Sequence, residues 1–199
     1  MAHIDYFFAT LSPYTYFAGT RLEEIAAKHG ATIAYKPLDI LALFARTGGT
    51  PPGERHPNRI AYRAQELQRI AKKTGLPFNL KPAHWPTNMA PSAYAVIAAQ
   101  KEGGGDLGKL VHAILRSCWA DEKDVADDAV IGDCLEEAGF DRGLSFTGLL
   151  VGAETYPANL EEAIDKGAFG APTYVVDDGA TFWGQDRLDD LDAHLAGTL

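Results

Sequence analysis

The chain has 199 residues, of which 46% are hydrophobic and 23% charged, the usual balance of a globular protein able to bury a sizeable core. Its 27 acidic residues outnumber its 18 basic residues, which gives a formal net charge of −9 at pH 7. A chain this acidic lacks the basic face that attracts nucleic acids and anionic membranes, so we expect neither as a partner.

The cysteines and histidines exclude further classes of protein. Cys118 and Cys134 are the only cysteines, and they form no CxxC motif, which argues against a disulfide framework, a cysteine-based zinc site and a dithiol redox motif. The six histidines are scattered without ligand spacing, so we expect no metal site. The opening MAHIDYFF does not resemble an export signal, and no apolar run could span a membrane, so we expect a reducing, cytoplasmic setting.

The first 38 residues predict a strand, a helix and a second strand. His3–Phe8 is rich in aromatic and β-branched residues, as in a short buried strand. Ser12 is a good helix N-cap, Pro13 suits the first helical position, and the apolar spacing that follows predicts one helix as far as Gly30. Thr32–Leu38 alternates as a second strand, and this order favours a parallel pair with a right-handed crossover.

The middle of the chain is different, because after a turn-rich loop at 47–53 nearly every periodic segment predicts a helix. The expected helices cover residues 58–73, 90–101, 107–120 and 129–138, followed by two weaker ones at 145–151 and 158–166.

Strand character returns near the end. Thr173–Val176 and Ala180–Trp183 flank an Asp-Gly turn signal at Gly179, which predicts a β-hairpin, and a last helix is expected over 185–196. The two outer pieces are too small to fold separately. We therefore predict one discontinuous domain, residues 1–45 and 167–199, interrupted by a helical insertion domain at 46–166.

This order of elements resembles the α/β thioredoxin-like fold of the DsbA type, which has a large all-helical insertion. Where that family has a CxxC after the first strand, the chain has Ser12-Pro13-Tyr14-Thr15. A serine there resembles the 2-hydroxychromene-2-carboxylate isomerases and the kappa-class glutathione transferases. Four segments carry the resemblance in the right order, namely 8–16, 57–69 with its Pro-x-Arg-x-x-Tyr-x-x-x-Glu-x-x-Arg pattern, 167–173 and 182–188.

The resemblance implies a function and partners. It implies a glutathione-dependent isomerase that interconverts a 2-hydroxychromene-2-carboxylate-type compound and its ring-opened benzylidenepyruvate in aromatic catabolism. It also implies a homodimer, which is the state of many relatives. The reaction would be a reversible addition of the glutathione thiolate. Two alternatives stay open, a kappa-like glutathione transferase or peroxidase and a non-catalytic thioredoxin-like domain that binds a thiol ligand.

Ser12 is the catalytic residue that the resemblance implies. Its hydroxyl would donate to the glutathione sulfur, and a hydrogen bond to a charged group contributes about 1.5–3 kcal/mol, with about 0.3–1 kcal/mol more from a helix N-terminus. A hundredfold gain in the thiolate form requires about 2.7 kcal/mol, so these two sources suffice. The alternative is that Ser12 only caps a helix.

Five residues are implied to bind glutathione. A cis peptide bond before Pro172 would turn the backbone of Ala171 outward, so that it pairs with the cysteinyl part of the tripeptide. Gln185 and Asp186 would hold the γ-glutamyl end at the start of the last helix, and Arg59 would hold the glycine carboxylate. Helix capping for Asp186 and an ordinary helix-surface role for Arg59 are the alternatives.

Tyr14, Trp85 and Asn88 are weaker candidates for the substrate pocket. The aromatic pair is better suited to packing than to chemistry, and Asn88 is also a candidate helix cap.

Four positions depart from the family pattern. Gly49 stands where kappa-class enzymes have an asparagine that contacts glutathione, Ala9 stands where isomerases often have an aspartate, and Arg59 and Glu66 replace a lysine and an aspartate. These departures bear on the glutathione contacts and on the exact substrate.

Overall fold

The computed structural model describes residues 1–199, and both ends of the chain contribute to its four-stranded sheet. The strands are β1 (His3–Phe8), β2 (Thr32–Pro37), β3 (Thr173–Val176) and β4 (Thr181–Trp183). Their order across the sheet is β2-β1-β3-β4. β1 pairs in parallel with β2 and antiparallel with β3, while β3 pairs antiparallel with β4. The predicted parallel pair and the predicted hairpin are both confirmed.

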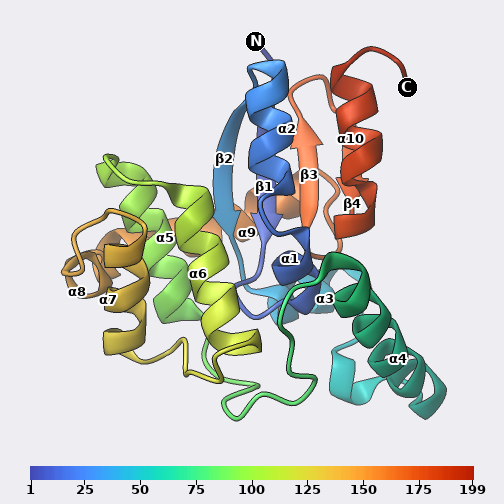
Figure 1. Cartoon of the computed structure of the whole chain (residues 1–199). Helices are drawn as coiled ribbons and strands as arrows, with labels where there is room; N and C mark the ends of the chain where they lie inside the picture. Colours follow the sequence, from blue (N-terminus) through green and yellow to red (C-terminus); the bar gives the residue numbers. More distant parts are fainter.

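Helices surround this sheet, and α5 to α8 form a separate stack beside it (Figure 1). The α-helices are α1 (Pro13–Ala18), α2 (Arg21–His29), α3 (Ile40–Thr47), α4 (Pro57–Thr74), α5 (Ala90–Glu102), α6 (Leu107–Trp119), α7 (Asp128–Glu137), α8 (Leu144–Thr147), α9 (Leu149–Asp165) and α10 (Leu188–Leu195), and the 3-10 helices are η1 (Pro52–Glu54) and η2 (Gln185–Arg187). No helix has both the length and the apolar character needed to cross a bilayer.

Side chains of β1 alternate between two apolar layers, as the pleat of a strand requires. Ile4, Tyr6 and Phe8 belong to the larger hydrophobic cluster, which also contains apolar residues of α2 and α10. Phe7 points to the other face, where it joins Leu43 of α3 and apolar residues of α9. Figure 1 shows α2 and α10 on one face of the sheet and α9 behind it. The fold is thus α/β with helices on both faces of the sheet.

The larger cluster has 33 buried residues and continues from the sheet into the helical stack. Val96 of α5, Leu110 of α6 and Leu135 of α7 belong to it together with the residues of the sheet. The division into a domain of residues 1–45 and 167–199 and an insertion of 46–166 stays a prediction, and its first boundary falls inside α3.

Two details of the predicted N-terminal part were wrong. The expected single helix up to Gly30 is two helices, because Gly19 has φ 59° and ψ −132°, outside the helical region, and separates α1 from α2. Helix α3 was not expected at all. Its N-cap is Asp39, whose side chain accepts hydrogen bonds from the N–H groups of Leu41 and Ala42.

The helices expected at 145–151 and 158–166 were also placed wrongly. The structure has a short α8 and a long α9 that begins at Leu149 and contains Pro157. Gly152 hid this helix from pattern analysis, because glycine weakens helix propensity. It is present for packing, since a Cβ at this position would lie 2.3 Å from the Cβ of Tyr94 on α5.

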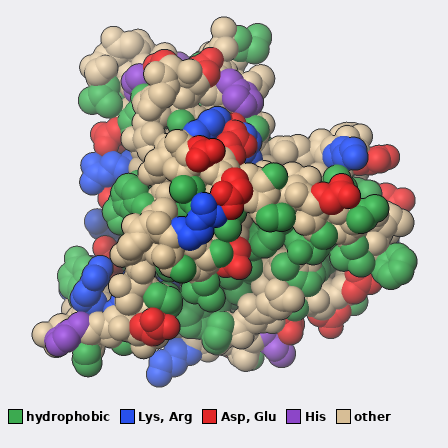
Figure 2. Space-filling model, turned by 180° about the vertical axis from the view of Figure 1, so that it is seen from behind, with side chains coloured by type: hydrophobic (Ala, Val, Ile, Leu, Met, Phe, Trp, Pro, Cys, Tyr) green, Lys and Arg blue, Asp and Glu red, His purple; other side chains and the backbone are tan.

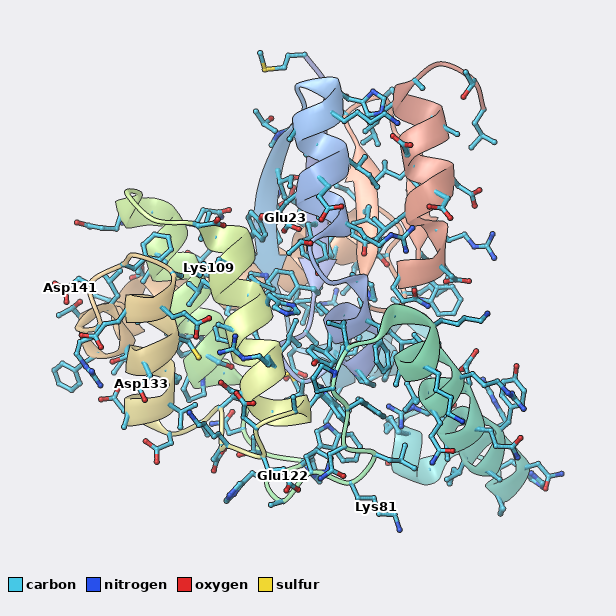
Figure 3. All side chains as sticks on the ribbon, viewed as in Figure 1. Glu23, Lys81, Lys109, Glu122, Asp133 and Asp141 are labelled. Carbon is cyan, nitrogen blue, oxygen red and sulfur yellow. The ribbon has the colours of Figure 1, made fainter.

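A second glycine brings the stack close to the sheet. Glu23 points from α2 toward α6 (Figure 3), and its Cγ would lie 2.6 Å from a Cβ at Gly108. Burial raises the pKa of Glu23, although a hydrogen bond from the Tyr35 hydroxyl at 2.8 Å acts in the opposite direction.

The opposite face of the sheet carries an ionic network. Asp5 of β1 is 5% exposed and pairs with Lys36 at 2.8 Å and with Lys166, while Glu162 of α9 pairs with both lysines. Seen from behind, acidic and basic side chains gather over the region of α9 (Figure 2). This network connects β1, β2 and α9.

Candidate active site

Ser12 lies at the turn between β1 and α1, half-buried. Its Oγ accepts a hydrogen bond from the Thr15 N–H at 3.2 Å and donates to the Ala171 carbonyl at 3.4 Å. The turn is anchored to α5, because the hydroxyl of Ser92 donates to that of Thr10 at 2.8 Å inside the core. Ser12 therefore acts as the N-cap that the sequence predicts, and its hydroxyl also faces the loop before β3.

That loop has the cis peptide bond expected between Ala171 and Pro172. The Ala171 N–H has no hydrogen-bond partner in the chain, and its carbonyl accepts only from Ser12. Gly170 lies under the indole of Trp183, since a Cβ there would be 2.4 Å from its Nε1. The loop thus presents an unused backbone donor next to the serine, 159 residues away in sequence.

A cavity of about 640 Å³ opens between this loop, α4 and η2, which is within the range of small-molecule sites. Its lining combines aromatic side chains, backbone of the cis-proline loop and six charged groups. The lining residues are Tyr14, Phe44, Arg55, Asn58, Arg59, Tyr62, Arg63, Glu66, Gly170, Ala171, Trp183, Gly184, Asp186 and Arg187.

The charges of the cavity are unbalanced. Arg187 pairs with Asp186 at 3.4 Å and with Asp190 at 3.1 Å. No ion pair of the chain includes Arg55, Arg59 or Arg63. The cavity is therefore locally basic in a protein of net charge −9.

Tyr14 connects α1 to α4 at the wall of the cavity. Its hydroxyl donates to Glu66 Oε2 at 2.7 Å, and the guanidinium of Arg63 lies over its ring at 5.9 Å. Burial, together with the nearby Glu66 carboxylate, raises the pKa of Tyr14 well above its ordinary value, so the phenol stays protonated and keeps donating. Burial also lowers the pKa of Arg63, and the charge of Arg55 adds to this effect.

The structure brings most of the predicted site residues together. Tyr14, Arg59, Ala171 and Asp186 line the cavity, whereas Ser12 is not among the lining residues but contacts one of them, Ala171. Pro172 and Gln185 are chain neighbours of lining residues. Their roles in binding and catalysis stay predictions.

Trp85 and Asn88 do not line this cavity. The Trp85 ring packs against Trp119 with centroids 5.7 Å apart. The Asn88 side chain accepts from the Ala90 N–H at 3.1 Å, so it contributes to capping α5. Their proposed contact with a substrate stays a prediction.

Sequence analysis missed several lining residues, including Phe44, Arg55, Arg63 and Trp183. One signal was available for Arg63, because it follows Arg59 by four residues, and this spacing places both side chains on one face of α4, whereas Arg55 precedes the helix. Phe44 depended on an unpredicted helix. At the loop after it, a Cβ on Gly49 would lie 2.3 Å from the Phe44 ring, so glycine allows the ring its place.

The thiols of the chain lie elsewhere. Cys118 and Cys134 are buried in α6 and α7, and burial raises the pKa of Cys118 to about 12 and also raises that of Cys134. No group of three or more His, Cys, Asp or Glu side chains is arranged to hold a metal ion.

A thioredoxin-like sheet, a cis-proline loop and a capping serine at the start of the first helix define a thioredoxin-fold protein of the DsbA type. The family model described as a DSBA-like thioredoxin domain matches residues 3–196. A 2-hydroxychromene-2-carboxylate isomerase of Sphingobium xenophagum is 30% identical over 195 residues, covering 96% of this chain and 97% of the relative. The chain therefore belongs to the DSBA-like thioredoxin domain family and, within it, to the family of the 2-hydroxychromene-2-carboxylate isomerases.

More distant comparisons agree with this fold. A protein named glutathione S-transferase kappa 2 of Caenorhabditis elegans is 24% identical over 207 residues, covering 97% of this chain and 91% of the relative. A solved 2-hydroxychromene-2-carboxylate isomerase matches with a TM-score of 0.78 at 24% identity, over 98% of this chain and 95% of that one. The cytosolic disulfide reductase DsbM of Pseudomonas aeruginosa, solved with GSH, gives 0.71 at 21% identity, over 98% of both chains.

Proposed function

We propose that the protein is a glutathione-dependent isomerase that interconverts a 2-hydroxychromene-2-carboxylate-type compound and its ring-opened benzylidenepyruvate. One observation carries the proposal. Ser12, at the position where DsbA-type proteins have their cysteine, donates to the carbonyl of Ala171, a residue that lines a basic cavity and whose N–H is unused. The isomerase relatives support the reaction, and the kappa-class relative and the reductase solved with GSH support the thiol.

The residues present fit glutathione. The free N–H of Ala171 can pair with the cysteinyl backbone in the manner of an added strand. The unpaired Arg59 can hold the glycine carboxylate through its planar fork of donors, and Asp186 can hold the ammonium group of the γ-glutamyl end. Gln185 begins η2 beside Asp186 and presents its backbone to the same end of the ligand.

When held by Arg59, Asp186 and the Ala171 N–H, glutathione would supply a thiolate able to add reversibly to a conjugated carbon of the substrate, which would permit rotation about the former double bond. Ser12 donates a hydrogen bond to the sulfur, which favours its ionised form. The cavity walls hold the rotating compound and exclude bulk water. Because the sulfur must attack and then leave, Ser12 serves best by lowering the thiol pKa moderately.

A kappa-like glutathione transferase or peroxidase is the second candidate, favoured by the kappa-class relative. A non-catalytic domain that binds a thiol ligand is the third. The isomerase and the transferase share the thiol site and differ in the product, since only the transferase leaves sulfur attached to the acceptor.

We also propose a homodimer, which sedimentation velocity over a concentration series measures directly.

A thermal shift and a spectroscopic assay test the proposal in sequence. Glutathione at one hundred times its Kd should stabilise the protein by about 2.7 kcal/mol. Absence of any shift at millimolar glutathione would overturn both glutathione-dependent readings. Isomerisation of the hydroxychromene carboxylate, measured with and without glutathione, then separates the isomerase from the transferase, whose product carries sulfur in a mass spectrum.

A further inference from the structure

Three arginines at the cavity stand apart from nearly all others in the chain. Arg55, Arg59 and Arg63 line one cavity without any ion pair. Away from this cluster the arginines are paired with acidic side chains, with the single exception of Arg69 on the exposed surface of α4, which bonds to Gln65. The paired arginines are Arg21, Arg46, Arg116, Arg142 and Arg187.

One thiol ligand does not use all three cations. Arg59 suffices for the glycine carboxylate, and Arg187 already pairs with Asp186 and Asp190. The only other acid in the lining, Glu66, accepts a hydrogen bond from Tyr14 and lies in no ion pair. Arg55 and Arg63 therefore remain outside any ion pair after glutathione has been accommodated, and Glu66, which acts on Arg63 from a greater distance, is the one carboxylate near them.

Aromatic rings, rather than carboxylates, hold these two guanidinium groups. Arg55 lies over the Phe44 ring at 5.8 Å and donates from Nε to the Thr50 carbonyl at 2.8 Å, and Arg63 lies over the Tyr14 ring. Both arginines are only partly exposed. Withdrawing a charge from water without a partner is unfavourable, so such a pair is suited to an anion that arrives with the ligand.

We infer that Arg55 and Arg63 bind the carboxylate of the second substrate and thereby select aryl carboxylates over neutral aromatic acceptors. The inference rests on the proposed function and adds the residues that set its specificity. The rings of Phe44 and Trp183, which line the same cavity, provide the apolar surface that the aryl part of such a substrate needs. A planar guanidinium matches a carboxylate with two parallel hydrogen bonds, which a lysine cannot reproduce.

The test compares Arg63→Met and Arg55→Met with the matched control Lys72→Met, an exposed cation on α4 outside the cavity lining. The probes are a benzylidenepyruvate and its methyl ester, each assayed with saturating glutathione. We expect KM for the acid to rise about 10- to 100-fold in the two arginine variants, the range of a lost charge-assisted hydrogen bond. KM for the ester and the Kd of glutathione should stay as in the wild type.

Two outcomes would overturn the inference. One is an unchanged KM for the acid in both variants. The other is a loss of glutathione affinity instead of a higher KM for the acid, which would show that the arginines bind glutathione. Thermal melts establish that the variants fold, and Arg63→Lys should restore only part of the affinity. If the wild type does not isomerise the acid, the proposed function fails, and calorimetric binding of the acid then tests the inference by itself. Binding that is lost in Arg63→Met would uphold the inference.

Discussion

The hydroxyl of Ser12 has two tasks that do not conflict. Its lone pair accepts from the Thr15 N–H, which satisfies one of the unpaired donors at the start of α1. Its proton points to the Ala171 carbonyl at 3.4 Å, a long distance for an O–H donor. The proton can therefore turn to a stronger acceptor such as a thiolate without loss of the cap.

Replacement of Ser12 by alanine should slow the isomerase strongly at neutral pH and much less at alkaline pH. Without the hydroxyl, the bound thiol loses about 1.5–3 kcal/mol of preference for its ionised form, so its pKa rises by roughly 1–2. The pH dependence of kcat/KM measures this directly. A variant with the wild-type profile would show that Ser12 only caps α1, in which case stability would still fall by about 1 kcal/mol.

The site residues that could be predicted from the sequence are those whose setting depends on their neighbours in the chain. Ser12 follows a strand and precedes a proline, and Pro172 lies in a recognisable loop, so both could be identified from their neighbours. Arg55 and Arg63 could not, because what distinguishes them is the absence of an acidic partner in space. The four-residue spacing from Arg59 to Arg63 was visible, but it does not show which face of α4 meets a cavity, and Arg55 lies outside that helix.

Glycines at helix contacts determine how closely the elements pack. Gly152 of α9 should not tolerate a methyl group, since its Cβ would lie 2.3 Å from the Tyr94 Cβ and 2.7 Å from the Tyr94 Cα. We expect Gly152→Ala to lower the free energy of unfolding by about 1–3 kcal/mol, because backbone would have to move. Gly53→Ala is the matched control, since no atom lies within 4 Å of its Cβ position. Urea unfolding of both variants would contradict this account if their midpoints agreed.

The network around Asp5 makes stability depend on pH. Burial favours the protonated form of Asp5, but hydrogen bonds from Lys166 and Lys36 outweigh it, so the pKa of Asp5 is lowered; the same balance lowers the pKa of Glu162. A lowered carboxyl pKa contributes stability that is fully present above the ordinary values of 3.8 and 4.5. That contribution disappears as the pH falls through the lower folded values.

Lys166→Met should therefore destabilise the protein by about 1–3 kcal/mol at pH 7, and by progressively less as the pH falls toward and through the lowered pKa values of Asp5 and Glu162. Urea unfolding at a series of pH values measures the difference, and Lys101→Met on exposed α5 surface is the control. A difference that stays constant from pH 7 to pH 3 would contradict an ionic role for Lys166.

The elements that sequence analysis misplaced are those whose ends tertiary contacts decide. The break between α1 and α2 depends on the backbone angles of Gly19. A glycine at this position of the sequence is compatible both with one continuous helix and with two helices. α3 had a usable N-cap in Asp39, but its short length left it within what looked like a strand-to-loop connection. The start of α9 was hidden by glycines that matter only because α5 lies against them.

The whole molecule should unfold as one unit, because a single cluster of buried residues joins the sheet to the helical stack. Leu110 of α6 is fully buried in it, so Leu110→Ala should lower the free energy of unfolding by about 2–5 kcal/mol. In the wild type and in Leu110→Ala alike, far-UV circular dichroism and tryptophan fluorescence should report the same unfolding transition. Two separate transitions would instead establish residues 46–166 as an independently stable domain.

The burial of Cys118 and Cys134 has a consequence for how the protein withstands oxidants. Since neither cysteine is exposed or readily ionised, the chain has no thiol that an electrophile or peroxide attacks easily. If the reactive sulfur comes from glutathione, oxidative damage falls on a small molecule that diffuses away and is replaced. The catalyst then has a renewable nucleophile, and its rate follows the supply of reduced thiol in its surroundings.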